Sequence, residues 1–165
     1  MKLSIKQLSI SAMIAAMYTT LTIIFSFMSY GDVQYRLAEA LTILPVYSPI
    51  YILGLFIGCI LSNLQSPLGP IDIVIGSLTT LVAATMTYFI GKSKLKYKTF
   101  LAPLPAVVLN ALVIGIELHI LVDAPLALGM LQVGWGQFVC AYVLGLLLMK
   151  YIEGKKSLKK LLSEN

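Results

Sequence analysis

The sequence has few charged residues. Asp, Glu, Lys and Arg make up 12% of the 165 residues, whereas soluble domains carry about 25%. Hydrophobic residues make up 59%, and the mean hydropathy is +0.92. The chain has too little polar surface to coat a soluble domain, and its surroundings must therefore be lipid. The composition therefore predicts a multi-pass integral membrane protein of the cell membrane, a single domain over residues 1–165.

Catalytic motifs are also missing. The sequence contains one histidine, no phosphate-binding GxxxxGKS or GxxxxGKT loop, no HExxH and no GxSxG, which excludes ATP hydrolysis, zinc proteolysis and serine hydrolase chemistry. Cys59 and Cys140 lie in apolar runs without CxxC spacing, so we expect both to pack as small apolar residues. The sequence thus predicts a protein that is not an enzyme and needs no cofactor or metal.

Long apolar runs fill the chain instead. A helix needs roughly 20 apolar residues to cross about 30 Å of hydrocarbon. About six such helices with short loops would therefore use almost the whole chain. Pro45 and Pro49 interrupt one apolar stretch and predict two short spans there. A cleaved signal peptide is the alternative for the first run, but that run is longer than a usual h-region. The predicted spans cover residues about 8–29, 36–47, 49–63, 71–90, 100–121 and 126–151.

The lysines are sorted along the chain. They lie in the N-terminal segment, in the 92–98 loop and in the tail from residue 150, and only Arg36 among the basic residues lies elsewhere. Because basic loops stay on the cytoplasmic side, an even number of spans places both termini and this loop in the cytoplasm. Topology and contact with anionic membrane lipid then explain the formal net charge of +5 without a nucleic-acid partner.

Acids and amides gather toward the opposite, outer side. Glu39 and Glu117 are the most deeply placed acids, and ionisable groups inside hydrocarbon usually mark a ligand or a pathway. Simpler explanations stay open: Arg36 and Glu39 could pair on one helix face, acids at helix ends could be caps, and Asn110 could bond between helices. Trp135 is deep enough in its span to stack on a planar ligand. The polar residues predicted on this side are Asp32, Gln34, Arg36, Glu39, Asn63, Gln65, Asp72, Glu117, His119, Asp123, Gln132, Trp135 and Gln137.

The first span carries two small residues four positions apart, Ala12 and Ala16. Such a pair lets two helices approach closely in lipid, although alanines at this spacing are common in membrane helices. The chain is also smaller than most secondary transporters and shows no paired repeats. These features favour a small binding protein that docks on a partner.

Three segments carry a family resemblance: residues 36–45 (RLAEALTILP), 54–63 (GLFIGCILSN) and 72–81 (DIVIGSLTTL). With them the chain resembles the QueT transporter family across nearly its full length. The resemblance implies an S-component, the substrate-binding subunit of an energy-coupling factor (ECF) transporter, with six transmembrane helices and a ligand site near the outer surface. It implies uptake of queuosine precursors, mainly 7-aminomethyl-7-deazaguanine. It also implies docking through Ala12 and Ala16 onto a transmembrane coupling protein that carries two ATPase subunits.

A deazaguanine ligand suits the polar residues. Its N–H edge can donate to a carboxylate, its carbonyl needs an amide or Arg donor, and its aminomethyl group is cationic. On this implied role, Glu39 or Glu117 binds the guanine edge, and the other acid or Asp72 binds the ammonium group. An amide binds the carbonyl or ring nitrogen, and Trp135 or a tyrosine stacks on the ring. The predicted substrate-binding residues are Arg36, Glu39, Asn63, Asp72, Asn110, Glu117, Gln132 and Trp135.

Other functions stay open at this point. The ligand could be another vitamin-like molecule bound by the same class of protein. The chain could instead be an autonomous proton-coupled carrier, in which Glu117 and His119 handle protons. A membrane enzyme is the least favoured alternative, because scattered acids and a single histidine leave no obvious active site.

Overall fold

The computed structural model describes residues 4–31 and 33–163, and these form helices joined by turns and short links, with no strand among them. The predicted all-α class is confirmed at this level. Asp32, one of the predicted outer acids, lies outside the described residues. The helices are α1 (Ile5–Ile24), α2 (Ser26–Ser29), η1 (Leu37–Val46), α3 (Ile50–Asn63), α4 (Pro70–Lys92), α5 (Lys98–Leu101), α6 (Leu104–Val122), α7 (Leu126–Gln137), η2 (Phe138–Leu144), α8 (Gly145–Gly154) and α9 (Lys156–Ser163).

Four helical segments are long and apolar enough to cross a membrane. They are Ile5–Ile24, Pro70–Lys92, Lys98–Val122 and Leu126–Gly154. The last of these joins α7, the π-helix η2 and α8 into one continuous segment. Large apolar side chains such as Leu78, Leu112 and Leu131 lie exposed along the long helices, as a lipid-facing surface requires. The chain is therefore a multi-pass membrane protein, as its composition predicted.

Two further apolar helices are shorter, and they coincide with the predicted second and third spans. The 3₁₀-helix η1 has 10 residues and α3 has 14. At about 2.0 Å per residue for a 3₁₀-helix and about 1.5 Å for an α-helix, each is roughly 20 Å long. A hydrocarbon core of about 30 Å is deeper than either. Within the described residues the bundle thus has four long apolar helices and two short ones, and six complete crossings remain a prediction.

The prolines explain why these two helices are separate. Pro45 lies near the end of η1, and Pro49 directly precedes α3. Proline lacks an amide donor and its ring clashes with the preceding turn, so one continuous helix cannot run through both. The division was predicted from the sequence, but the 3₁₀ geometry of the first piece was not.

Helix α1 packs along α3 through small residues. A Cβ added to Gly54 would lie 2.7 Å from the Ser11 carbonyl oxygen, and one added to Gly58 would lie 2.8 Å from the Tyr18 Cβ. Glycine is therefore needed for the two backbones to approach so closely. The Ser11 hydroxyl also donates to the Ile50 carbonyl at 2.8 Å, which fixes how far one helix is shifted along the other.

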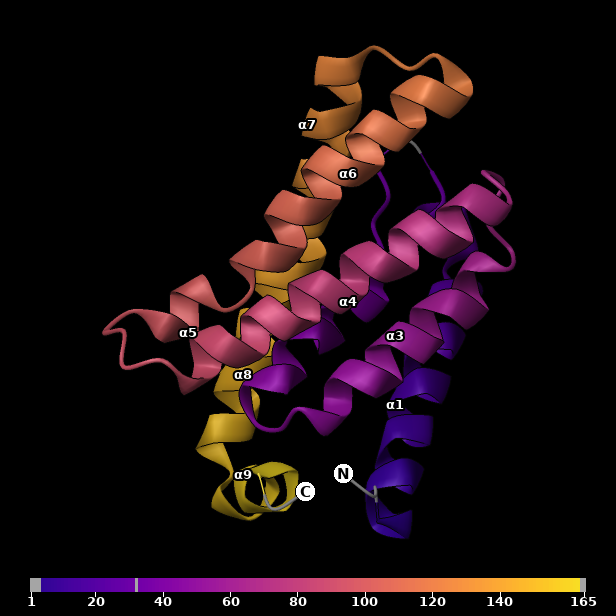
Figure 1. Ribbon diagram of the computed structural model, residues 1–165. Helices are drawn as coiled ribbons and strands as arrows, with labels where there is room; N and C mark the ends of the chain where they lie inside the picture. The colour runs from indigo at the N-terminus through magenta and orange to yellow at the C-terminus, as the bar shows by residue number, and fades with distance from the viewer. Residues whose placement is uncertain (1–3, 32, 164–165) are drawn as a thin grey trace.

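The bundle has two distinct ends (Figure 1). The described chain begins and ends at the lower one, the terminal end, where α9 and the start of α1 line the same hollow. The turn between α6 and α7 projects at the opposite end, the α6–α7 end, and the α3–α4 turn lies toward the same side. Chain ends on one side agree with an even number of crossings, while the cytoplasmic assignment of that side rests on the lysines alone.

Candidate functional site

Five polar side chains are buried in the half of the bundle toward the α6–α7 end. Arg36 precedes η1 and Glu39 lies in its first turn, Asn63 ends α3, Asp72 lies in the first turn of α4, and Glu117 lies late in α6. None is more than 6% exposed. All five were predicted from the sequence as substrate-binding residues. Because buried ionisable groups are costly inside a membrane protein, this group is the candidate functional site.

The thiol of Cys59 on α3 accepts hydrogen bonds from three side chains. Its Sγ accepts from Arg36 Nη1 at 4.0 Å, from Asn63 Nδ2 at 3.6 Å and from Thr80 Oγ1 at 3.3 Å. Cys59 is part of the hydrophobic core, as expected, and the structure adds these hydrogen bonds to its packing role. A thiol is small and weakly polar, so nothing in its identity signalled this position; its spacing of four from Asn63 was the available signal.

Glu39 is held by the first helix. The Tyr18 hydroxyl of α1 donates to Glu39 Oε1, and Tyr18 is fully buried. The second carboxylate oxygen, Oε2, has no hydrogen-bond partner within the described residues. Sequence analysis missed Tyr18, because an aromatic residue in an apolar helix is most often a packing residue. Glu39 therefore keeps one oxygen available for a ligand.

Arg36 is buried, and among the described residues no acid forms an ion pair with it. No ion pair within 4 Å joins it to Glu39; the ion pair found among the described residues is Lys159 with Glu153, near the terminal end. Its guanidinium lies 5.5 Å from the centre of the Tyr30 ring, and its Nε has no hydrogen-bond partner in the described part of the chain. The simple alternative of an Arg36–Glu39 pair is thus not what the structure contains.

A glycine makes room for the amide and acid at the α3–α4 end of the group. Asn63 Nδ2 donates to the backbone carbonyl of Asp72 at 3.0 Å. A Cβ added to Gly76 would lie 2.6 Å from Asn63 Nδ2 and 2.8 Å from Asp72 Oδ1. Asn63 Oδ1 is buried with no partner among the residues described. Gly76 therefore lets both polar side chains lie against α4.

Glu117 is the least satisfied member of the group. Its side chain is 3% exposed, and neither carboxylate oxygen has a hydrogen-bond partner among residues 4–31 and 33–163. Asp72 and Arg36 both act on it electrostatically, which places it in the same group as the residues of η1 and α4. A buried carboxylate costs free energy unless it is paired, hydrogen-bonded or neutralised. Glu117 is thus suited to bind a cationic or N–H-bearing ligand, or a proton.

A pocket of about 340 Å³ lies beside this group, toward the α6–α7 end. That volume falls within the range of about 300–1,000 Å³ common for small-molecule sites. Tyr30 connects the two, because it lines the pocket and also lies against Arg36. The pocket is lined by Tyr30, Gly31, Gln34, Ser66, Pro67, Leu68, Leu118, Val122, Ala124 and Gln132.

The chain segment that forms one wall of the pocket crosses α7 at a glycine. A Cβ added to Gly136 would clash with the carbonyl oxygen of Val33 and lie 2.9 Å from that of Gln34. Gln34 has a φ of 51°, an uncommon conformation for a residue with a side chain. Such strain is often found at ligand sites, and Gln34 lines the pocket beside the polar group.

Comparison with known proteins gives this site a family. Residues 8–154 match the QueT transporter family. The chain belongs to this family. A relative from Lactococcus lactis subsp. cremoris (strain MG1363), described as queuosine precursor transporter QueT, is 38% identical over 73 residues, which is 43% of this chain and 43% of that protein. The alignment thus spans less than half of the relative, and no solved structure matches the chain significantly.

Membership of a transporter family agrees with the prediction of a transport protein rather than an enzyme. The three segments that carried the resemblance contribute most of the buried group. Residues 36–45 supply Arg36 and Glu39, residues 54–63 supply Cys59 and Asn63, and residues 72–81 supply Asp72, Gly76 and Thr80. The three segments on which the resemblance was first recognised therefore supply most of the residues that build the site.

The remaining predicted site residues have different positions. Gln132 lines the pocket. Asn110 is buried on α6, two turns before Glu117, and its Nδ2 donates to Ala106 of its own helix at 2.8 Å. Trp135 is 57% exposed, and its ring stacks on Phe138 with the centroids 5.8 Å apart.

These positions change the expected aromatic partner. The structure does not bring Trp135 to the buried group, because a residue's depth in a helix does not determine which face it occupies. Tyr30 is the aromatic ring that borders both the pocket and Arg36. His119 is exposed, and its Nδ1 forms a hydrogen bond of 2.8 Å with the Ala124 carbonyl, so it caps the α6–α7 turn rather than joining Glu117.

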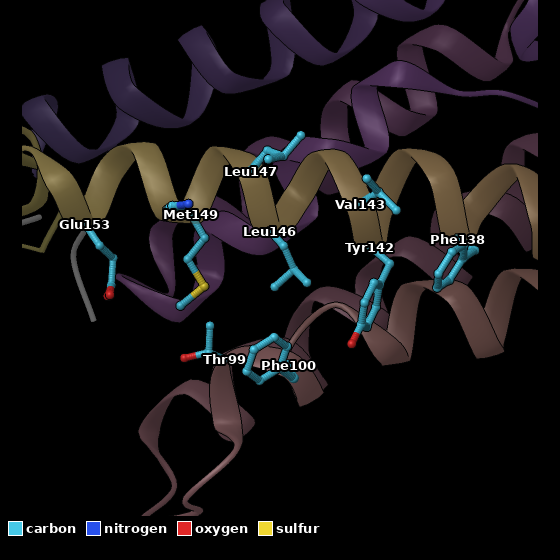
Figure 2. Close-up of a pocket in the computed structure, with 10 residues that line it drawn as sticks. Thr99, Phe100, Phe138, Tyr142, Val143, Leu146, Leu147, Met149 and Glu153 are labelled. Carbon is cyan, nitrogen blue, oxygen red and sulfur yellow. The ribbon is translucent and has the colours of Figure 1, made fainter.

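A second, larger hollow has a different character. A groove of about 490 Å³ runs between α5 and the η2–α8 segment (Figure 2). Its walls are mainly aromatic and aliphatic side chains, including Phe100, Tyr142 and Leu146. It contains none of the predicted substrate-binding residues. We therefore place the candidate substrate site at the polar group and not at this larger groove.

Proposed function

We propose that the chain is the substrate-binding S-component of an ECF-type importer and captures 7-aminomethyl-7-deazaguanine, a queuosine precursor, from outside the cell. One observation carries the proposal: Arg36, Glu39, Asn63 and Glu117 each keep a buried polar atom without a hydrogen-bond partner among the described residues. Each such atom costs roughly 1–3 kcal/mol. A ligand that bonds to several of them at once recovers that free energy, which favours a small molecule rich in donors and acceptors.

The unpaired atoms complement a deazaguanine in charge and in hydrogen bonding. Glu39 Oε2 and the two oxygens of Glu117 are acceptors, which suit the N–H edge of the base and the cationic aminomethyl group. Asp72 is the further acid for the ammonium group. Arg36 Nε is a donor for the exocyclic carbonyl, and Tyr30 borders the pocket for stacking. The relative described as a queuosine precursor transporter supports this choice of ligand.

The orientation of the chain fits capture from outside. In the proposed topology six spans place both termini and the 92–98 lysine loop in the cytoplasm, so the pocket at the α6–α7 end opens outward. Ala12 and Ala16 are exposed on α1 and would meet the transmembrane coupling protein. Two ATPase subunits bound to that protein would supply the energy, because this sequence contains no phosphate-binding loop.

Calorimetric titration of the purified chain with 7-aminomethyl-7-deazaguanine tests the site. We expect Glu39→Gln and Glu117→Gln each to weaken binding at least tenfold, because a hydrogen bond to a charged group is worth about 1.5–3 kcal/mol. Glu153→Gln is the matched control, since Glu153 is an exposed acid paired with Lys159, and its affinity should equal that of the wild type. Wild-type affinity in both site variants would refute the assignment, and no binding by the wild-type chain would refute the ligand.

A second function is favoured by Glu117 itself. A buried carboxylate with both oxygens free of partners in the described chain is also what a proton-coupled carrier uses. Uptake of labelled ligand by vesicles that contain only this chain distinguishes the two. We expect no uptake without the coupling protein and ATPases. Uptake that follows an imposed proton gradient would establish the carrier instead.

A further inference from the structure

The groove between α5 and the η2–α8 segment is apolar along its length and polar at one end. Phe138 and Tyr142 of η2 are stacked with their ring centroids 5.2 Å apart and line the apolar part. Leu146 and Phe100 continue it, as Figure 2 shows. Thr99, Lys150 and Glu153 lie at the other end. An apolar trough that ends in polar groups has the polarity pattern of a phospholipid.

The polar end carries an excess of positive charge. Lys150 lines the groove and is exposed, and the exposed Lys98 begins α5 beside Thr99. The acid in the groove, Glu153, is paired with Lys159 at 3.2 Å, so its charge is offset. The charge complements an anionic headgroup rather than a neutral one.

The length of the groove also suits a lipid chain. From Phe138 to Lys150 the helix advances roughly 18 Å at about 1.5 Å per residue. One leaflet of the hydrocarbon core is about 15 Å deep, half of about 30 Å. An acyl chain that begins at the headgroup level beside Lys150 therefore reaches the neighbourhood of Phe138, near the middle of the bilayer.

We propose that this groove is a binding site for an anionic diacyl phospholipid of the cytoplasmic leaflet. The acyl chain lies along Leu146, Tyr142 and Phe138, and the phosphate lies beside Lys150. The site is separate from the buried polar group, so it requires neither a deazaguanine ligand nor an ATPase. The bound lipid fills the groove between α5 and the η2–α8 segment.

Trp135 provides a direct readout. It is the only tryptophan in the sequence, and it stacks on Phe138 at the inner end of the groove. The purified chain is placed in vesicles of phosphatidylcholine and phosphatidylglycerol, with brominated acyl chains on one of the two lipids at a time. Bromine quenches tryptophan fluorescence at short range. We expect quenching by brominated phosphatidylglycerol to correspond to a concentration near Trp135 about fivefold above its share of the bilayer. The reason is that one lysine near an anionic lipid contributes ~1 kcal/mol.

Matched variants connect the preference to the groove. In Lys150→Gln, the preference for phosphatidylglycerol over phosphatidylcholine in quenching should fall severalfold. Lys94→Gln changes an exposed lysine outside the groove and should leave this preference unchanged. Leu146→Phe should fill the groove and remove the preference while annular phosphatidylcholine quenches as before. Equal quenching by both lipids in the wild type, or an equal effect of the two lysine variants, would overturn the proposal. Equal quenching by both lipids would indicate instead that an apolar helix of a partner protein occupies the groove.

Discussion

Helix α1 has two faces made of similar small residues, and they have different surroundings. Ser11 and Ala15 are 1% and 4% exposed and lie against α3. Ala12 and Ala16, each one position further along, are exposed. Both pairs have the spacing of four that allows close helix packing. Only the first pair has matching glycines opposite it within the described chain, namely Gly54 and Gly58.

The comparison shows that a small-residue pair does not by itself identify a partner interface. One such pair on α1 is used inside the chain, where α3 presents its glycines. The other is left on the outer surface, which is what the proposed docking role of Ala12 and Ala16 requires. The packed face also carries Tyr18, which bonds to Glu39, so the same helix borders the candidate substrate site and the proposed docking surface.

Enlarging the exposed face should give the largest effect. We expect the double variant Ala12→Leu, Ala16→Leu to lose more than tenfold of its co-purification with the transmembrane coupling protein, because the added side chains hold the two helices apart. Its melting temperature in detergent should match the wild type, since both positions are exposed. Undiminished co-purification would show that the partner docks on another surface.

Enlarging the packed face should instead destabilise the protein. In Gly58→Ala the new Cβ would lie 2.8 Å from the Tyr18 Cβ and 3.0 Å from the Ala15 carbonyl oxygen. Overpacking of this kind costs about 2 kcal/mol, seen as a lower melting temperature in detergent. Gly154→Ala is the control, because no atom lies within 4 Å of its added Cβ. A stability equal to that of Gly154→Ala would contradict the close α1–α3 contact.

Removing the Tyr18 hydroxyl tests the link from α1 to the site. Tyr18→Phe should weaken binding of 7-aminomethyl-7-deazaguanine about fivefold, since a hydrogen bond that orients a ligand group is worth roughly 1 kcal/mol. If Tyr18 acts through Glu39, the same change should have no further effect in a Glu39→Gln background. Tyr51→Phe is the control: Tyr51 is also fully buried, but its hydroxyl bonds to Leu162 near the terminal end. Additive losses in the double variant would exclude this route.

The smallest effect concerns the hydrogen bond that fixes the shift of α1 along α3. Ser11→Ala removes the bond to the Ile50 carbonyl and should lower the unfolding free energy by about 0.5 kcal/mol, at the low end for a neutral bond. Ser9→Ala is the matched change on an exposed position, where the hydroxyl bonds only to Ile5 of its own helix. Ser11→Ala should melt at a lower temperature than Ser9→Ala. Identical melting temperatures would mean that the Ser11 hydroxyl does not stabilise the contact between α1 and α3.

The membership of the candidate site was largely predictable, and its detailed contacts were not. Arg36, Glu39 and Glu117 were conspicuous because charged residues are rare in apolar helices. Cys59 was assigned to packing, since its side chain is as compatible with an apolar core as with hydrogen bonding. Trp135 was predicted to stack on the ligand, but it lies on the outer surface, which its spacing in an almost uniformly apolar helix did not reveal.

The sequence by itself determined that the protein lies in a membrane, that it is helical and how its charges are distributed. These properties follow from composition and from the order of polar and apolar residues. The sequence also carried the family resemblance and placed the division at Pro45 and Pro49. Tertiary structure decided which face of each helix is used. It buried Ser11 and left Ala12 exposed, and it brought Tyr18 to Glu39. The physical reason is that, in a helix that is apolar all round, periodicity does not mark the packed face; the shape of the neighbouring helix does.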